Sequence, residues 1–194
     1  MIRAILDGRK GQTRRIVKPQ PPAGVRSAGV IHSQAESNGQ WGWLDAEDLM
    51  DAGFIGDWFR CPFGVPGDRL WVKETWVPAL AVGAFYRATH EKLLRDDGWR
   101  GKWKPSIFMP RAASRITLTI TDIRCEPLQA ISETDAIAEG VYRSGKRWEI
   151  EGIVATPFSA ADAYKSLWNY IHGRDAWDQN PWVWVVCFTA EKKR

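Results

Sequence analysis

The side chains best suited to chemistry lie near the start of the chain, in the segment GRKGQTRR that runs from Gly8 to Arg15. Side chains alternate along a strand, so a strand that begins near Thr13 places Thr13 and Arg15 on one face and Arg14 on the other. Lys10, in the turn just before, can reach over the face of Thr13 and Arg15. Hydrolysis of an amide needs a nucleophile, a proton acceptor and a donor for the oxyanion. A hydroxyl, an amine and a guanidinium supply part of that set, and a carboxylate must come from elsewhere in the chain.

Positive charge is concentrated in the same region. Residues 1–18 hold six basic side chains and one acid, a sum of +5, whereas the whole chain of 194 residues carries +4. A local positive charge attracts a phosphate or a polyanion to one place. We therefore expect substrate or nucleic acid to contact Arg9, Arg14 and Arg15, and also Arg115 further along the chain. A basic, solvated terminus without a ligand is the alternative.

Several classes of protein are not indicated by the sequence. It contains no glycine-rich phosphate loop and no HExxH motif, and its three histidines, His32, His90 and His172, lack the spacing of metal ligands. Three cysteines without a CxxC motif argue against a disulfide framework or a zinc site. We therefore expect no metal and no cofactor. We also expect no membrane, because a membrane helix needs about 20 apolar residues in a row and the sequence has no such run. A reducing cytoplasm is the expected setting.

The pattern of apolar and turn residues predicts an α+β domain. Helices are expected at residues 2–7, from Ser132 to Gly140, and from Ser159 to His172; strands are expected at Thr13–Val17, Arg69–Lys73, Ala84–Ala88, from Ile116 onward, and at Trp182–Phe188. These elements suit a small, mostly antiparallel barrel. Residues 1–194 are expected to form a single domain with irregular insertions at about 19–60, 89–105 and 142–157.

The twelve tryptophans divide into two groups. Trp182 and Trp184 lie in a strand that is apolar on both faces, which is typical of a fully buried strand. Five others lie in glycine-rich or charged stretches, and these are the expected platform for stacking on bases: Trp41, Trp43, Trp58, Trp99 and Trp103.

Four segments, in this order, resemble the ASCH domain family. They are GRK-x-x-T-x-R at residues 8–15, PGD-x-L at 66–70, the strand at 116–123, and ISE-x-x-A-x-x-EG at 131–140, followed by a last strand that ends at Phe188. The resemblance covers about half of the chain and implies a small barrel related to the PUA fold. The longer form seen here, with a Cys-Pro-Phe-Gly segment and extra tryptophans, is similar to members from phages and prophages.

Bacterial members of this family include N(4)-acetylcytidine amidohydrolases, which use a lysine, a threonine and a glutamate. The resemblance places these roles on Lys10, Thr13 and Glu139, with Arg15 as a supporting cation. In one assignment, which we slightly favour, Lys10 takes the proton of Thr13, for which its pKa must fall from ~10.4 to ~7–8. In the other, Glu139 activates a water molecule while Lys10 stays charged and holds the oxyanion. The sequence does not decide between them.

The resulting hypothesis is a hydrolase that removes an acyl group from a modified pyrimidine nucleoside or nucleotide. The alternative is an RNA- or DNA-binding module, with a metal-independent ribonuclease as its catalytic variant; Lys10, Arg15 and Glu139 would act on the ribose hydroxyl and the phosphate. A third hypothesis is a phage accessory protein whose insertions contact another protein. The sequence does not indicate the oligomeric state.

Overall fold

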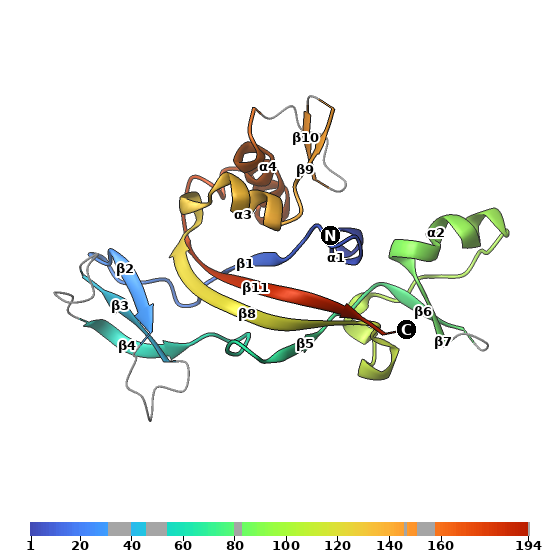
Figure 1. Cartoon of the computed structure of the whole chain (residues 1–194), viewed down its shortest axis with the longest axis horizontal. Helices are drawn as coiled ribbons and strands as arrows, with labels where there is room; N and C mark the ends of the chain where they lie inside the picture. Colours follow the sequence, from blue (N-terminus) through green and yellow to red (C-terminus); the bar gives the residue numbers. More distant parts are fainter. Residues whose placement is uncertain (31–39, 46–53, 80–82, 146, 151–157, 194) are drawn as a thin grey trace.

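A curved antiparallel sheet forms the centre of the protein (Figure 1). The computed structural model describes residues 1–30, 40–45, 54–79, 83–145, 147–150 and 158–193. The central strands are β1 (Gln12–Ile16), β11 (Trp182–Lys192), β8 (Ile116–Pro127) and β5 (Arg69–Trp71), hydrogen-bonded in the order β1-β11-β8-β5. In the described part of the chain the edge strands β1 and β5 do not pair with each other. The fold is thus α+β and antiparallel, as expected, but the sheet does not close into the expected barrel.

Both faces of β11 are buried, which confirms the prediction for Trp182–Phe188. Val183 and Val185 pack with the helices α3 (Glu133–Ala138) and α4 (Ala160–His172) on one face. Trp184 and Val186 pack on the other face in a second apolar cluster. The alternation of Ile116, Leu118 and Ile120 along β8 also places apolar side chains in the interior, as predicted. These two long strands carry most of the core.

The segment 19–60, expected to be irregular, instead contributes a three-stranded antiparallel sheet. Its strands are β2 (Ser27–Val30), β3 (Gln40–Leu44) and β4 (Phe54–Arg60), while residues 31–39, with His32, and 46–53 lie outside the described part of the chain. Glycines interrupt the alternation of apolar residues, and the register shifts between Trp41 and Trp43. This explains why the sequence showed no period of two.

The expectation of exposed tryptophans was wrong for Trp41 and Trp43. They are only 7% and 4% exposed, and the ring of Trp41 lies 5.0 Å, edge to face, from that of Trp184. Trp58 is 44% exposed, whereas Trp99 and Trp103 are half-buried against each other. Burial of a large aromatic surface under the sheet outweighs the polar residues that surround these rings in sequence.

A hairpin and a helix extend from one end of the central sheet (Figure 1). The hairpin consists of β6 (Trp76–Ala79) and β7 (Gly83–Tyr86), and α2 (Arg87–Asp96) follows it directly. The expected loop at 89–105 therefore begins with a helix, and the expected strand at Ala84–Ala88 ends at Tyr86. Ion pairs from Arg87 and Arg95 to Glu91, each four residues apart, support this polar helix.

The remaining elements are short. They are α1 (Ile2–Leu6), the 3-10 turns η1 (Ser106–Phe108), η2 (Arg111–Ala113) and η3 (Leu128–Ala130), and the paired strands β9 (Tyr142–Ser144) and β10 (Arg147–Glu149). The last pair occupies part of the expected irregular insertion at 142–157, of which residues 146 and 151–157 lie outside the described part. None of the described helices is long and apolar enough to cross a membrane.

The predicted helix ends are confirmed. Ser132 accepts a hydrogen bond from the Asp135 backbone N–H, the Asp135 carboxylate accepts one from the Ser132 N–H, and the two form a capping box at the start of α3. At the start of α4, the Ser159 hydroxyl accepts a hydrogen bond from the Asp162 backbone N–H. The capping box matters most for the site, because it fixes the start of the helix that ends at Glu139.

Candidate functional site

The structure brings Lys10 and Glu139 together in the interior, although 129 residues separate them. The Lys10 ammonium donates to Glu139 Oε2 at 2.6 Å and to the Glu139 backbone carbonyl at 2.8 Å. Lys10 is 5% exposed and Glu139 is 1% exposed. A buried ion pair is stable only when its geometry is good and its remaining polar atoms find partners. The two residues therefore form one tightly constrained unit.

Backbone contacts hold the two segments in place. The Lys10 N–H donates to the Ala4 carbonyl in α1 at 3.0 Å, and the Gly11 N–H donates to the Ala138 carbonyl at the end of α3 at 2.9 Å. The Gly11 carbonyl accepts from the Phe188 N–H in β11 at 2.8 Å. The turn before β1 is thus fastened to a helix on one side and to the central sheet on the other.

Gly140 permits the close approach of these segments. Its φ is +103°, and a Cβ at this position would lie 3.2 Å from the Ala4 Cβ and 3.5 Å from the Lys10 Cβ. We expect Gly140→Ala to destabilise the protein by about 1–3 kcal/mol, through backbone strain together with this contact. Gly98→Ala is the matched control, because Gly98 has a φ of +76° with no atom within 4 Å of the added Cβ. Urea unfolding of both variants checks this, and an equal loss of stability would show that the contact is unimportant.

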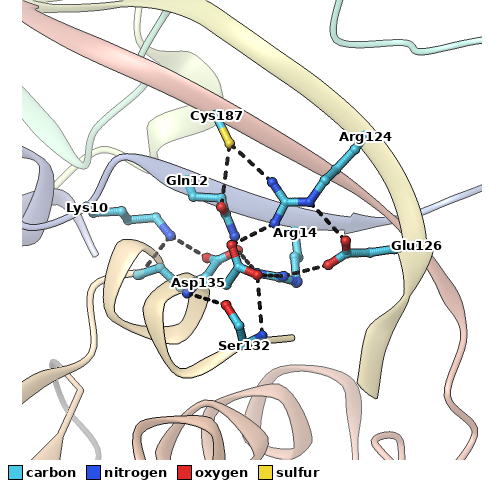
Figure 2. A network of polar contacts seen from close by, with 9 residues as sticks. Lys10, Gln12, Arg14, Arg124, Glu126, Ser132, Asp135 and Cys187 are labelled. Carbon is cyan, nitrogen blue, oxygen red and sulfur yellow. Dashed lines mark hydrogen bonds and ion pairs between the residues drawn. The ribbon is translucent and has the colours of Figure 1, made fainter. Parts of the chain in front are cut away.

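A network of charges surrounds the buried pair (Figure 2). The Arg14 guanidinium is fully buried and lies 2.8 Å from Glu126, 3.2 Å from Asp135 and 3.7 Å from Glu139. Arg124 lies 2.9 Å from Glu126 and 2.6 Å from Asp135. Three cations therefore face three carboxylates, which links α3 to β1 and β8.

The network gives Asp135 a measurable pH signature. Burial opposes ionisation, but hydrogen bonds from Arg124 and Ser132 and the charge of Arg14 lower the pKa of Asp135 to about 2. The folded pKa lies below the unfolded value, so the stabilisation is present above about pH 4 and is lost as the pH falls toward 2. It amounts to at most ~2 kcal/mol, and solvent screening of this partly exposed group reduces it to about 1 kcal/mol. The free energy of unfolding is measured with urea at pH 6 and at pH 3. Its change between the two pH values should be smaller for Asp135→Asn than for the unaltered protein, and an equal change would contradict this origin.

Glu139 also lines a small cavity at the base of α4. The residues around it include Thr13, Arg15, Tyr164 and His172, and its volume of about 20 Å³ is enough for one water molecule. Glu139 Oε1 is buried and has no hydrogen-bond partner in the described part of the chain. The two oxygens of this carboxylate therefore differ: Lys10 donates a hydrogen bond to Oε2, whereas Oε1 accepts none and lies 3.7 Å from Arg14 Nη1.

Lys10 is not among the residues that line this cavity, although its ammonium contacts Glu139, which is one of them. Burial lowers the pKa of Lys10, while the adjacent Glu139 carboxylate acts in the opposite direction. Of the two candidate bases, Glu139 lines the cavity and Lys10 does not, and the choice between the two assignments stays a prediction.

The other predicted binding residues have different surroundings. Arg15 is exposed at the rim of the cavity, whereas Arg14 is enclosed by the charge network. Arg9 pairs with Asp7 at 2.9 Å and lies over the ring of Tyr142. Arg115 makes two hydrogen bonds of 2.9 Å to the buried Glu74, away from the cavity. The structure thus brings Lys10, Thr13, Arg14, Arg15 and Glu139 into one region, and leaves out Arg9 and Arg115.

Sequence reasoning missed the wall that α4 provides. Tyr164, Trp168 and His172 line the cavity, and their spacing of four residues places them on one helix face. Burial raises the pKa of Tyr164, and burial, with a smaller contribution from Arg15, lowers the pKa of His172. The spacing was visible in the sequence, but it is equally typical of a helix that packs on a core.

Among the described residues, no three histidine, cysteine or acidic side chains lie close enough together to hold a metal ion. The three cysteines are unpaired, and burial raises the pKa of the Cys61 thiol. Comparisons with protein-family models, with curated proteins and with solved structures find no match to this chain.

Proposed function

We propose that the protein is a hydrolase that removes an acyl group from a modified pyrimidine nucleoside or nucleotide, as N(4)-acetylcytidine amidohydrolases do. One observation carries the proposal. A buried carboxylate, Glu139, has Oε2 fixed by Lys10, while Oε1 makes no hydrogen bond among the described residues and lies 3.7 Å from Arg14 Nη1, in a cavity also lined by Thr13, Arg14 and Arg15. A carboxylate so placed is well suited to act as a general base toward a water molecule.

In the proposed reaction, Glu139 takes a proton from a water molecule in the cavity. The water oxygen forms a bond to the acyl carbon, and the Thr13 hydroxyl orients it. The exposed guanidinium of Arg15 lies at the rim and stabilises the oxyanion of the tetrahedral intermediate. The C–N bond then breaks, the proton on Glu139 passes to the leaving amine, and acetate and cytidine are released. Lys10 is a positioning residue, because its hydrogen bond to Oε2 orients Glu139.

The substrate site must open for this reaction. A ligand the size of a nucleoside needs a cavity of a few hundred Å³, whereas this cavity, at about 20 Å³, has room for a single water molecule. Its rim includes Ile171 and His172, at the exposed C-terminal end of α4. We infer that the last turn of α4 moves outward when a pyrimidine binds, and that the ring then lies against Trp168.

The proposed relationship to the ASCH family is compatible with these features. The turn at Gly8–Arg15 and the end of α3 at Glu139 are the two segments that the resemblance aligns with catalytic residues, and they pack directly on each other. A PUA-like origin would require an open form of the barrel, because the central sheet is not closed in the described part of the chain.

The test is release of acetate by the purified protein at neutral pH. N(4)-acetylcytidine is the substrate, and N-acetylated amino acids and N-acetylglucosamine are controls for general amide hydrolysis. We expect acetate and cytidine in equal amounts from the nucleoside and none from the controls. No release from the nucleoside or from its 5′-phosphate would reject the proposed function.

A further inference from the structure

A second cavity is lined by residues of β5, β8 and the C-terminal segment. Its volume is about 250 Å³, and it shares no lining residue with the Glu139 cavity. We call it the basic groove; the residues around it are Arg69, Trp71, Arg111, Ser114, Thr117 and Lys193. Strands β5 and β8 supply Trp71 and Thr117, η2 supplies Arg111, and Lys193 is held here because its N–H donates to the Arg115 carbonyl.

The groove is positively charged. Three of its lining residues are cations and none is an acid. In the part of the chain that the structure describes, the one carboxylate paired with them is Glu191, which lies 2.9 Å from Arg69; both side chains are more than 60% exposed, so the pair is weak. Arg111 and Lys193 have no ion pair among the described residues, and both are exposed. An anion can therefore approach these two without displacing a partner.

The groove also carries an aromatic surface. Trp71 is half-buried, and the Lys73 ammonium lies 5.0 Å from the centre of its ring. Lys73 also donates to the Ile107 carbonyl at 3.2 Å, which holds η1 against this edge of the sheet. In η1, Phe108 is 70% exposed. Cations next to exposed aromatic rings are the features that bind single-stranded nucleic acids, through phosphate contacts and stacking of bases.

We propose that the basic groove binds a single-stranded nucleic acid. One phosphate lies between Arg111 and Lys193, and the adjacent base stacks on Trp71. The volume fits about one nucleotide unit rather than a whole ligand, so the strand continues across the exposed side chains of Arg69 and Lys73. Because the cations are exposed, each contributes little to the free energy of binding. A strand with several phosphates therefore binds the groove better than a single phosphate does.

Binding of a fluorescent twelve-nucleotide oligo(dT) to the full chain tests this. We expect binding at 50 mM salt that weakens steeply by 200 mM, with a slope of about −0.7 per phosphate contact in a plot of log K against log[salt]. Arg111→Ala and Lys193→Ala should each weaken binding several-fold and reduce the magnitude of the slope by about 0.7. Arg95→Ala, an exposed arginine on α2, is the matched control and should leave binding unchanged. Equal binding by all three variants, or no binding at 50 mM salt, would overturn the proposal.

Stacking is tested with Trp71→Phe and Trp71→Ala. Trp71→Phe should retain most of the affinity and Trp71→Ala should lose about tenfold or more. Because Trp71 is half-buried, circular dichroism checks the fold of both variants. If Trp71→Ala is unfolded, tryptophan fluorescence is measured instead. Oligo(dT) should then quench the fluorescence of the unaltered protein, and this quenching should be lost in Trp71→Phe. Inorganic polyphosphate of equal charge should compete poorly, and competition equal to that of oligo(dT) would overturn the stacking role. Oligo(dT) carries no acyl group, so these results are independent of acetate release.

Discussion

Glu139→Gln is expected to reduce acetate release from N(4)-acetylcytidine by about 10³-fold, the size of a general-base contribution. The amide keeps the shape of the side chain and can still accept a hydrogen bond from Lys10, but it cannot take a proton from water. The measurement is the initial rate of acetate release at saturating substrate. Asp178→Asn is the matched control, because it makes the same chemical change at an exposed carboxylate.

Two further variants distinguish the roles around Glu139. Lys10→Met should lower the rate less than Glu139→Gln, because it removes the hydrogen bond that orients Glu139 but leaves the carboxylate in place. Thr13→Ala should retain measurable turnover, because in the proposed mechanism Thr13 orients the water molecule and Glu139 is the base. A complete loss in Thr13→Ala with recovery in Thr13→Ser would instead support Thr13 as the nucleophile. A rate for Glu139→Gln within a few-fold of the unaltered protein would exclude Glu139 as the base.

The second large effect concerns stability. We expect Glu139→Leu to lower the free energy of unfolding by about 3–5 kcal/mol, because it leaves the Lys10 ammonium buried without its counterion. Lys10→Met should lower the free energy of unfolding by less, since Arg14 remains 3.7 Å from the Glu139 carboxylate and can compensate its charge. Urea unfolding at neutral pH measures both values. A smaller loss for Glu139→Leu than for Lys10→Met would contradict this description of the network.

The double variant Lys10→Met/Glu139→Leu should recover much of the stability lost in Glu139→Leu. Replacing a whole buried ion pair by apolar side chains of similar volume is often neutral or stabilising, whereas breaking one is costly. The coupling between the two positions is read from the double-mutant cycle. Strictly additive losses would mean that the pair does not interact in the folded protein.

The parts of the fold that the sequence predicted are those where local pattern and tertiary burial agree. The alternation of Ile116, Leu118 and Ile120 predicted the inner face of β8, and Ser132 predicted the start of α3. The meeting of Lys10 and Glu139 came from the resemblance to ASCH domains and not from spacing, because no local pattern relates positions 129 residues apart. Long-range pairing depends on the topology of the whole sheet.

The errors arose where tertiary contacts override local composition. The glycine-rich stretch around Trp41 and Trp43 resembles a loop in sequence. Its rings nevertheless pack in one apolar cluster with Trp184 of β11, and the segment forms a strand that pairs with β4. Arg14 was expected to bind a ligand because it is basic; it lines the Glu139 cavity, and it also pairs with Glu126 and Asp135 from distant segments, which its sequence neighbourhood did not indicate. Charge along a sequence does not reveal which cations will meet a carboxylate inside the fold.

The folded double variant gives the most direct test of the central claim that Lys10 and Glu139 form a catalytic unit. Acetate release by Lys10→Met/Glu139→Leu should be compared with that of the unaltered protein, at a temperature where circular dichroism shows both to be folded. The account predicts a stable protein with no acetate release above background. Turnover equal to that of the unaltered protein would show that the buried pair is only part of the scaffold, and the proposed mechanism would then be wrong.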